Sequence, residues 1–115
     1  MKQAKFEYTE TFASQMDARF QRLAGSVGGR SAEATLMATL QSFEERVGAH
    51  PFSAPVCKEM VDLGRANVRE YIDVARQQRL IYQVSPEGAT VTGLLLLSTR
   101  QSVEEALVQY CLWRE

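Results

Sequence analysis

The segment from Arg79 to Arg100 constrains the fold more than any other part of the chain. Beginning with Leu80, large apolar side chains stand at every second position up to Val84, which indicates a strand with two different faces. Turn residues follow at 85–88 (SPEG), and residues 90–98 are then almost wholly apolar. Because a strand with two apolar faces must be covered on both sides, we expect the second strand in the middle of a sheet.

Length and composition indicate a single domain spanning residues 1–115. The chain is 45% hydrophobic and 23% charged, as is typical of globular proteins. Its 13 lysine and arginine residues are balanced by 14 acidic residues, which argues against broad, non-specific binding to nucleic acid. There is no apolar run of about 20 residues, and the N-terminus lacks the apolar core of a signal peptide. These features predict a cytoplasmic protein that does not span a membrane.

Two amphipathic helices are predicted before the strands. The first is followed by a glycine-rich break at residues 25–29, and Ser31 is the expected N-cap of the second. Since so few residues separate the two helices, they are expected to form an antiparallel hairpin that covers the sheet. Their apolar stripes consist of Phe12, Met16, Phe20 and Leu23 in the first helix and of Leu36, Leu40, Phe43 and Val47 in the second.

The remaining elements complete an α+β domain. A short opening strand is expected at residues 5–9 and a short edge element at 56–61. The segments 68–74, 79–85 and 89–98 form an antiparallel meander, and Ser102 begins a C-terminal helix. The prediction is therefore a helical hairpin packed on a mostly antiparallel four-stranded sheet, with a helix at the C-terminus.

No side chains stand in a pattern typical of a metal or cofactor site. The cysteines, Cys57 and Cys111, lack the spacing of metal ligands and are expected to be reduced thiols. His50, the single histidine, precedes a proline in a predicted loop and is expected to be a surface or structural residue. No metal and no cofactor is expected.

The order of the elements, together with two short motifs, resembles the RelE/ParE superfamily of toxins from type II toxin–antitoxin systems, also called plasmid stabilisation proteins. Residues 67–72 (NVREYI) and 78–84 (QRLIYQV) are similar to the family's paired strands. The last strand with its terminal residues 98–100 (STR), the helical hairpin and the Pro51-Phe52 crossing extend the resemblance over nearly the whole chain. The resemblance implies the RelE/ParE fold, a toxic activity and a cognate antitoxin as partner.

The superfamily contains two toxic mechanisms, and the residues at the site indicate which of them a given member uses. RelE-like members cut messenger RNA on the ribosome, and ParE-like members poison DNA gyrase. By resemblance, the RelE-like catalytic cations would be Lys58, Arg79 and Arg100. RNA cleavage also needs a general base, and the RelE-like tyrosine after the final-strand arginine is replaced here by residues 101–103 (QSV). The expected base is therefore missing, which argues against a ribonuclease.

The leading hypothesis is consequently a ParE-like toxin that acts on DNA gyrase through Arg69, Arg79 and Arg100. One alternative is a RelE-like, ribosome-dependent messenger RNA endoribonuclease, whose partners would be the ribosome and messenger RNA. Another is an inactive binding module with the same fold, because fold alone does not fix function. The arginines also have a purely structural interpretation, as cross-strand partners of Glu70 and Asp73.

The cognate antitoxin is expected to dock on apolar residues of the first and last helices. A short partner helix lying in an apolar groove would be recognised in this way. The competing expectation for most of these residues is ordinary packing in the core. The candidates for antitoxin binding are Phe12, Met16, Leu107, Tyr110 and Trp113.

Overall fold

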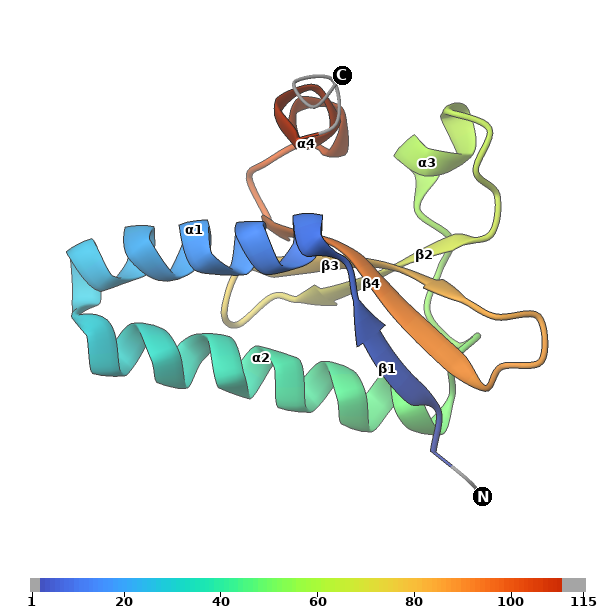
Figure 1. Ribbon diagram of the computed structural model, residues 1–115, viewed down its shortest axis with the longest axis horizontal. Coiled ribbons are helices and arrows are strands. Elements are labelled where there is room, and N and C mark those ends of the chain that lie inside the picture. Colours follow the sequence, from blue (N-terminus) through green and yellow to red (C-terminus); the bar gives the residue numbers. More distant parts are fainter. Residues whose placement is uncertain (1–2, 111–115) are drawn as a thin grey trace.

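The computed structural model describes the backbone of residues 3–110 and the side chains of residues 3–106. In Figure 1, α3 and α4 lie on the same side of the sheet, away from α2. The elements in chain order are β1 (Lys5–Tyr8), α1 (Glu10–Val27), α2 (Gly29–Ala49), α3 (Lys58–Asp62), β2 (Val68–Asp73), β3 (Gln78–Val84), β4 (Thr90–Ser98) and α4 (Val103–Tyr110).

The four strands form one mixed sheet in the order β1-β4-β3-β2. The pairs β2–β3 and β3–β4 are antiparallel, which confirms the predicted meander, while β1 pairs with β4 in parallel. Ile81 faces Leu95 and Tyr82 faces Gly93, so Leu94 is an extra residue that forms a bulge in β4. The apolar strand β4 lies in the middle of the sheet, as its sequence predicts.

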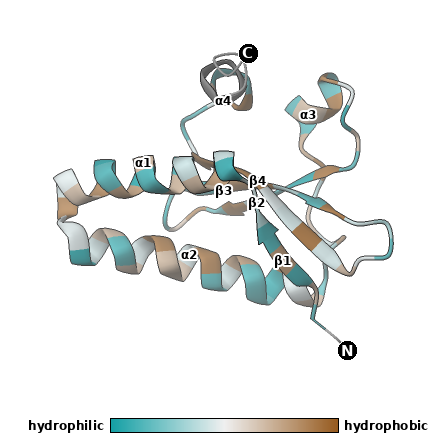
Figure 2. Cartoon of the chain, viewed as in Figure 1, coloured by the Kyte–Doolittle hydropathy of each residue, from teal (hydrophilic) through white to brown (hydrophobic). Residues whose placement is uncertain are grey.

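Each face of the sheet carries its own apolar cluster. The first cluster joins the sheet to α1 and α2, and the second joins it to α3 and α4. In Figure 2, hydrophilic and hydrophobic residues are interspersed along α1 and α2, as amphipathic helices require. The first cluster consists of Phe12, Phe43, Val47, Leu80, Tyr82, Val84, Val91 and Leu96, and the second of Cys57, Met60, Val68, Ile81, Leu95, Leu97, Val103 and Ala106.

Beyond the end of β1, side chains of α1 and of its N-cap form hydrogen bonds with backbone groups of β4. The hydroxyl of Thr9, the N-cap of α1, donates to the carbonyl of Leu94 at 3.2 Å and accepts from the N–H of Phe12 at 3.0 Å. One turn further along, the buried Oε1 of Gln15 accepts from the N–H of Leu96 at 2.8 Å. Because an unpaired buried N–H is costly, these side chains fix α1 against the sheet.

Two local predictions are wrong. Helix α1 continues through Gly25 and ends only at Gly28, which has φ +90° and also serves as the N-cap of α2 in place of Ser31. A residue that lacks a Cβ adopts this backbone conformation without strain, so Gly28 determines the turn. The segment 56–61 is not an edge strand: Val56 forms a single bridge to Arg69, and the chain then enters α3.

Candidate functional site

Arg79, in β3, is held more tightly than the other candidate cations. Its guanidinium lies between the carboxylate of Glu70 on β2 and that of Glu59 in α3, the latter at 3.3 Å. Nη1 also donates to the backbone carbonyl of Gln101 at 3.3 Å. Only 13% of the Arg79 side chain is exposed. We call Arg79, Glu70 and Glu59 the Arg79 cluster; within it, the positive charge is neutralised by the protein itself.

The pKa shifts in the Arg79 cluster follow from burial and pairing. Burial acts to lower the pKa of Arg79, but the hydrogen bond and charge of Glu70, and then those of Glu59, outweigh it and raise the pKa. For Glu59, burial acts to raise the pKa, while its own backbone N–H and the charge of Arg79 leave it lowered. A carboxylate with a lowered pKa is a poor proton acceptor, so Glu59 is not tuned to serve as a general base.

Of the two ion pairs of Arg79, only the one with Glu70 was predicted from the sequence. The pairing of Arg79 with Glu70 is the predicted structural alternative, a cross-strand pair in an antiparallel sheet. Glu59 was missed because its segment was predicted to be a strand. The apolar residues Cys57 and Met60 are spaced as on one helical face, which is the signal that could have identified α3.

Arg69, in β2, occupies a separate site beside the crossing that follows α2. Its Nη1 donates to the carbonyl of Ala54 at 2.5 Å, and its guanidinium lies 5.4 Å from the centre of the Phe52 ring. The Phe52 side chain is 50% exposed. Burial raises the pKa of neighbouring Tyr82 to about 12, so this phenol stays protonated at neutral pH. In the described part of the chain, no carboxylate is paired with Arg69.

The other two candidate cations, Lys58 and Arg100, are exposed, and each is adjacent in sequence to a residue that Arg79 contacts. Lys58 is the first residue of α3 and directly precedes Glu59. Arg100 lies in the turn after β4 and directly precedes Gln101, whose carbonyl Arg79 binds. One guanidinium therefore binds the carboxylate of Glu59, next to Lys58, and the backbone carbonyl of Gln101, next to Arg100. Because Arg79 is paired with carboxylates, the three cations do not form a free cationic surface.

The candidate antitoxin-binding residues fall into three groups. Phe12 is 3% exposed and belongs to the first apolar cluster. Met16 is partly buried and lines a surface hollow between α1 and α2. Leu107 and Tyr110 lie in α4 but outside the described side chains, and Trp113 lies outside the described residues.

The hollow between α1 and α2 is apolar and has a volume of about 340 Å³. Met37, one of its lining residues, is 57% exposed. The lining residues are Ala13, Met16, Asp17, Phe20, Glu33, Leu36 and Met37.

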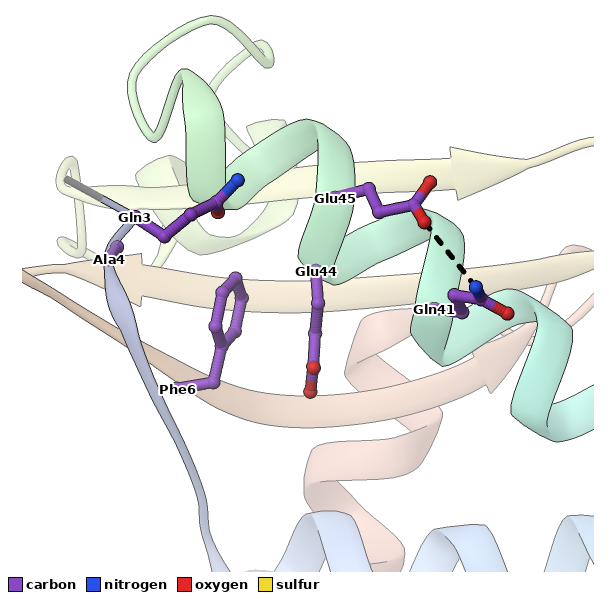
Figure 3. A pocket seen from close by; sticks show the side chains of 6 residues that line it. All are labelled: Gln3, Ala4, Phe6, Gln41, Glu44 and Glu45. Carbon is purple, nitrogen blue, oxygen red and sulfur yellow. Dashed lines mark hydrogen bonds between the residues drawn. The ribbon is translucent and has the colours of Figure 1, made fainter. Parts of the chain in front are cut away.

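A second hollow, of about 310 Å³, lies between the start of the chain and α2 (Figure 3). The described residues that line it are Gln3, Ala4, Phe6, Gln41, Glu44 and Glu45. Gln41 donates to Glu45 at 3.4 Å, and Glu44 accepts a hydrogen bond from Tyr8. Burial, followed by this bond, raises the pKa of Tyr8.

Two further properties of the described residues bear on function. Within them, no group of three or more histidine, cysteine, aspartate and glutamate side chains is placed to hold a metal ion. None of the described helices has the length and apolarity needed to cross a bilayer.

Comparison with solved structures identifies the fold. The chain matches the chromosomal ParDE toxin–antitoxin system of P. aeruginosa with a TM-score of 0.68 and 14% identity, over 84% of this chain and 96% of that one. It matches the toxin–antitoxin complex RelBE2 of Mycobacterium tuberculosis with a TM-score of 0.58 and 17% identity, over 85% and 93%. A mutant of the E. coli toxin RelE in the free state gives a TM-score of 0.58 and 16% identity, over 99% and 98%.

At the level of sequence, no family model and no curated protein matches the chain. The structural matches cover most of each partner at low identity, and they confirm the predicted fold: two N-terminal helices packed on a four-stranded sheet, as in ParE and RelE.

Proposed function

We propose that this chain is the toxin of a type II toxin–antitoxin pair, that it inhibits growth by acting on DNA gyrase, and that a cognate antitoxin neutralises it. The RelE/ParE fold and the family-like strand motifs support the toxin class. Two of the matched structures are described as a toxin–antitoxin system and a toxin–antitoxin complex, which supports a protein partner of the same kind here.

The burial and pairing of the Arg79 guanidinium favour one of the two toxic mechanisms over the other. A ribonuclease needs cations that face the phosphate, where charge develops in the transition state. Arg79, one of the three catalytic candidates, instead faces two carboxylates of its own chain and is largely buried. Releasing it to meet RNA would leave Glu70 unpaired with only 14% of its side chain exposed, and an unpaired charge at such depth is costly. The arrangement favours a toxin that works by binding rather than by cleaving RNA.

The target-binding residues that we propose are Arg69 and Arg100, together with Arg79 as the third member of the predicted set. Arg69 offers a guanidinium without a carboxylate partner among the described residues, next to the exposed Phe52 ring. Arginine beside an exposed aromatic ring is a combination enriched where proteins bind one another. Arg100 adds an exposed charge at the end of the central strand.

For the antitoxin we propose the hollow between α1 and α2, with Met16 as its central contact. Met16 is the one candidate of the predicted set that both lies on this hollow and has a described, partly buried side chain. An apolar groove between helices suits an amphipathic helix of a partner protein. Phe12 belongs to the first apolar cluster, against which Met16 packs.

The target is tested by expressing the wild-type chain in a short pulse and measuring two outcomes together. We expect blocked supercoiling in an assay with purified gyrase, accompanied by filamentation and a DNA-damage response. Messenger RNA ends mapped from the same cells should show no new cleavage on translating ribosomes. Codon-phased cleavage with untouched supercoiling would instead establish the ribonuclease, with Lys58, Arg79 and Arg100 as its catalytic residues.

The antitoxin is tested by co-expression with the product of the adjacent gene and size-exclusion chromatography. A stable complex is expected, and Met16→Asp should weaken it because a charge would have to be buried in an apolar groove. Gln21→Asp is the matched control, since it places the same charge on the exposed side of α1. If the wild-type chain elutes alone, the proposed partner is wrong; if growth inhibition is also absent, the chain is an inactive module with the same fold.

A further inference from the structure

Arg79 contacts four parts of the fold at once. It belongs to β3, it pairs with Glu70 on β2, it pairs with Glu59 in α3, and it donates to the carbonyl of Gln101 just before α4. The last two contacts cross from the sheet to the two short segments that cover its second face. Helices α3 and α4 meet the sheet in the second apolar cluster, and the Arg79 cluster adds a polar connection to the same two segments.

Two candidate functional residues, Lys58 and Arg100, lie beside the residues that Arg79 contacts. Lys58 is adjacent to Glu59, and Arg100 is adjacent to Gln101, so each exposed cation lies one residue from a group that Arg79 binds. Helix α3 has only five residues, and short elements at the surface open locally more easily than the middle of a sheet does. A buried charged anchor that holds both segments therefore limits how far Lys58 and Arg100 move relative to each other.

We infer that Arg79 is a positioning residue, which fixes α3 and the turn before α4 so that Arg100 keeps its place on the surface that meets the target, and that it does not itself contact the target. This inference rests on the proposed function, in which Arg79 was a member of the binding site. It replaces a direct role for Arg79 with an indirect one, and it gives roles to Glu59 and Glu70 as well.

Removing the carboxylates separates the two roles, because the roles predict opposite signs. If Arg79 contacts an anionic target, Glu70→Ala frees its charge, and inhibition should stay equal or increase. If Arg79 positions its neighbours, the same variant should weaken inhibition roughly tenfold or more, since the buried charge loses its main partner. Glu59→Ala should act in the same direction. Glu45→Ala, which removes an exposed carboxylate of α2, is the matched control and should change nothing.

A charge exchange gives a second, independent test. Arg79→Glu alone places three carboxylates together and should abolish inhibition. Combining it with Glu70→Arg restores an ion pair between β2 and β3, but it leaves Glu59 facing a carboxylate and the carbonyl of Gln101 without its donor, so inhibition should stay lost. Arg100→Ala should reduce the inhibition of the wild-type chain. A folded exchange variant that inhibits as well as the wild type would show that the contacts of Arg79 with α3 and the turn are not needed.

Hydrogen exchange tests the anchor without any target. The amides of Met60 and Val61 in α3 and of Ala106 in α4 are hydrogen-bonded to Cys57 and Ser102. In Glu70→Ala and Arg79→Ala these amides should exchange roughly tenfold faster, while amides of α2 keep the wild-type rate. Unchanged exchange in α3 and α4 refutes the anchor. A wild-type chain that does not inhibit gyrase refutes the proposed function instead, so the two failures are distinct.

Discussion

Gly93 lies where β1, α1 and the central strand β4 meet, and replacing it with alanine should destabilise the fold. A Cβ at this position would lie 2.6 Å from Cδ1 and 3.0 Å from Cε1 of Tyr8, and 3.2 Å from Cδ2 of Phe12. Movement of the Tyr8 ring is resisted, because its hydroxyl is bonded to Glu44 and its ring packs on Phe12 with 4.8 Å between the ring centres. Either the ring or the start of α1 must move.

The cost follows from the depth of the overlap. Forcing one methyl group into a packed site typically costs about 1–3 kcal/mol. For a chain of this length that corresponds to a fall in melting temperature of roughly 4–12 °C. If the Tyr8 hydroxyl also leaves Glu44, the loss moves toward the upper end of this range.

Gly25→Ala is the matched control, because a Cβ at Gly25 has no neighbour within 4 Å and the residue lies inside α1. Alanine there should stabilise the chain by about 0.5–1 kcal/mol. Unfolding by denaturant measures both variants, and Tyr8→Ala combined with Gly93→Ala should recover part of the loss. Equal stability of Gly93→Ala and the wild type would refute the described packing of β1 and α1 on β4.

Three further predictions follow from single residues. Burial acts to raise the pKa of Asp73, but the hydrogen bonds of Arg76 and Thr39 and the charge of Arg76 together outweigh it and leave the pKa lowered. The stability that Asp73 contributes is present above its ordinary pKa near 4 and is lost as the pH falls through the lowered value, so Asp73→Asn should make the free energy of unfolding less dependent on pH in acid. Gln77 has φ +58°, so Gln77→Gly should stabilise the chain by about 0.5–1 kcal/mol in denaturant unfolding, and a loss of stability would contradict the left-handed turn. Burial raises the pKa of Cys57, which is 0% exposed, so in a Cys111→Ser background its alkylation should be as slow as unfolding, whereas reaction at the rate of a free thiol would show that the second face is open.

Much of the fold was predictable because it depends on local patterns. The two-residue period of β2 and β3, and the unbroken apolar run of β4, identified the meander and its central strand. The stripes of α1 and α2 identified the hairpin, and Ser102 was confirmed as a cap, since its hydroxyl accepts from the N–H of Glu105 at 3.0 Å. The errors fell where local signals are weak: α3 offers only one pair of apolar residues at helical spacing, Cys57 and Met60, and Gly25 costs a long helix too little to end it.

The sequence by itself determined that this chain has two N-terminal helices and a central apolar strand covered on both faces. It also placed Arg79 and Arg100 at the two ends of the β-hairpin that β3 and β4 form. Only the tertiary structure decided what Arg79 does. The same arginine could contact a target or a carboxylate of its own chain. Which of the two it contacts depends on Glu59, 20 residues away, which reaches Arg79 only after α3 packs against the sheet. A charged side chain is placed by such long-range contacts because burying it is costly unless a partner is there to meet it.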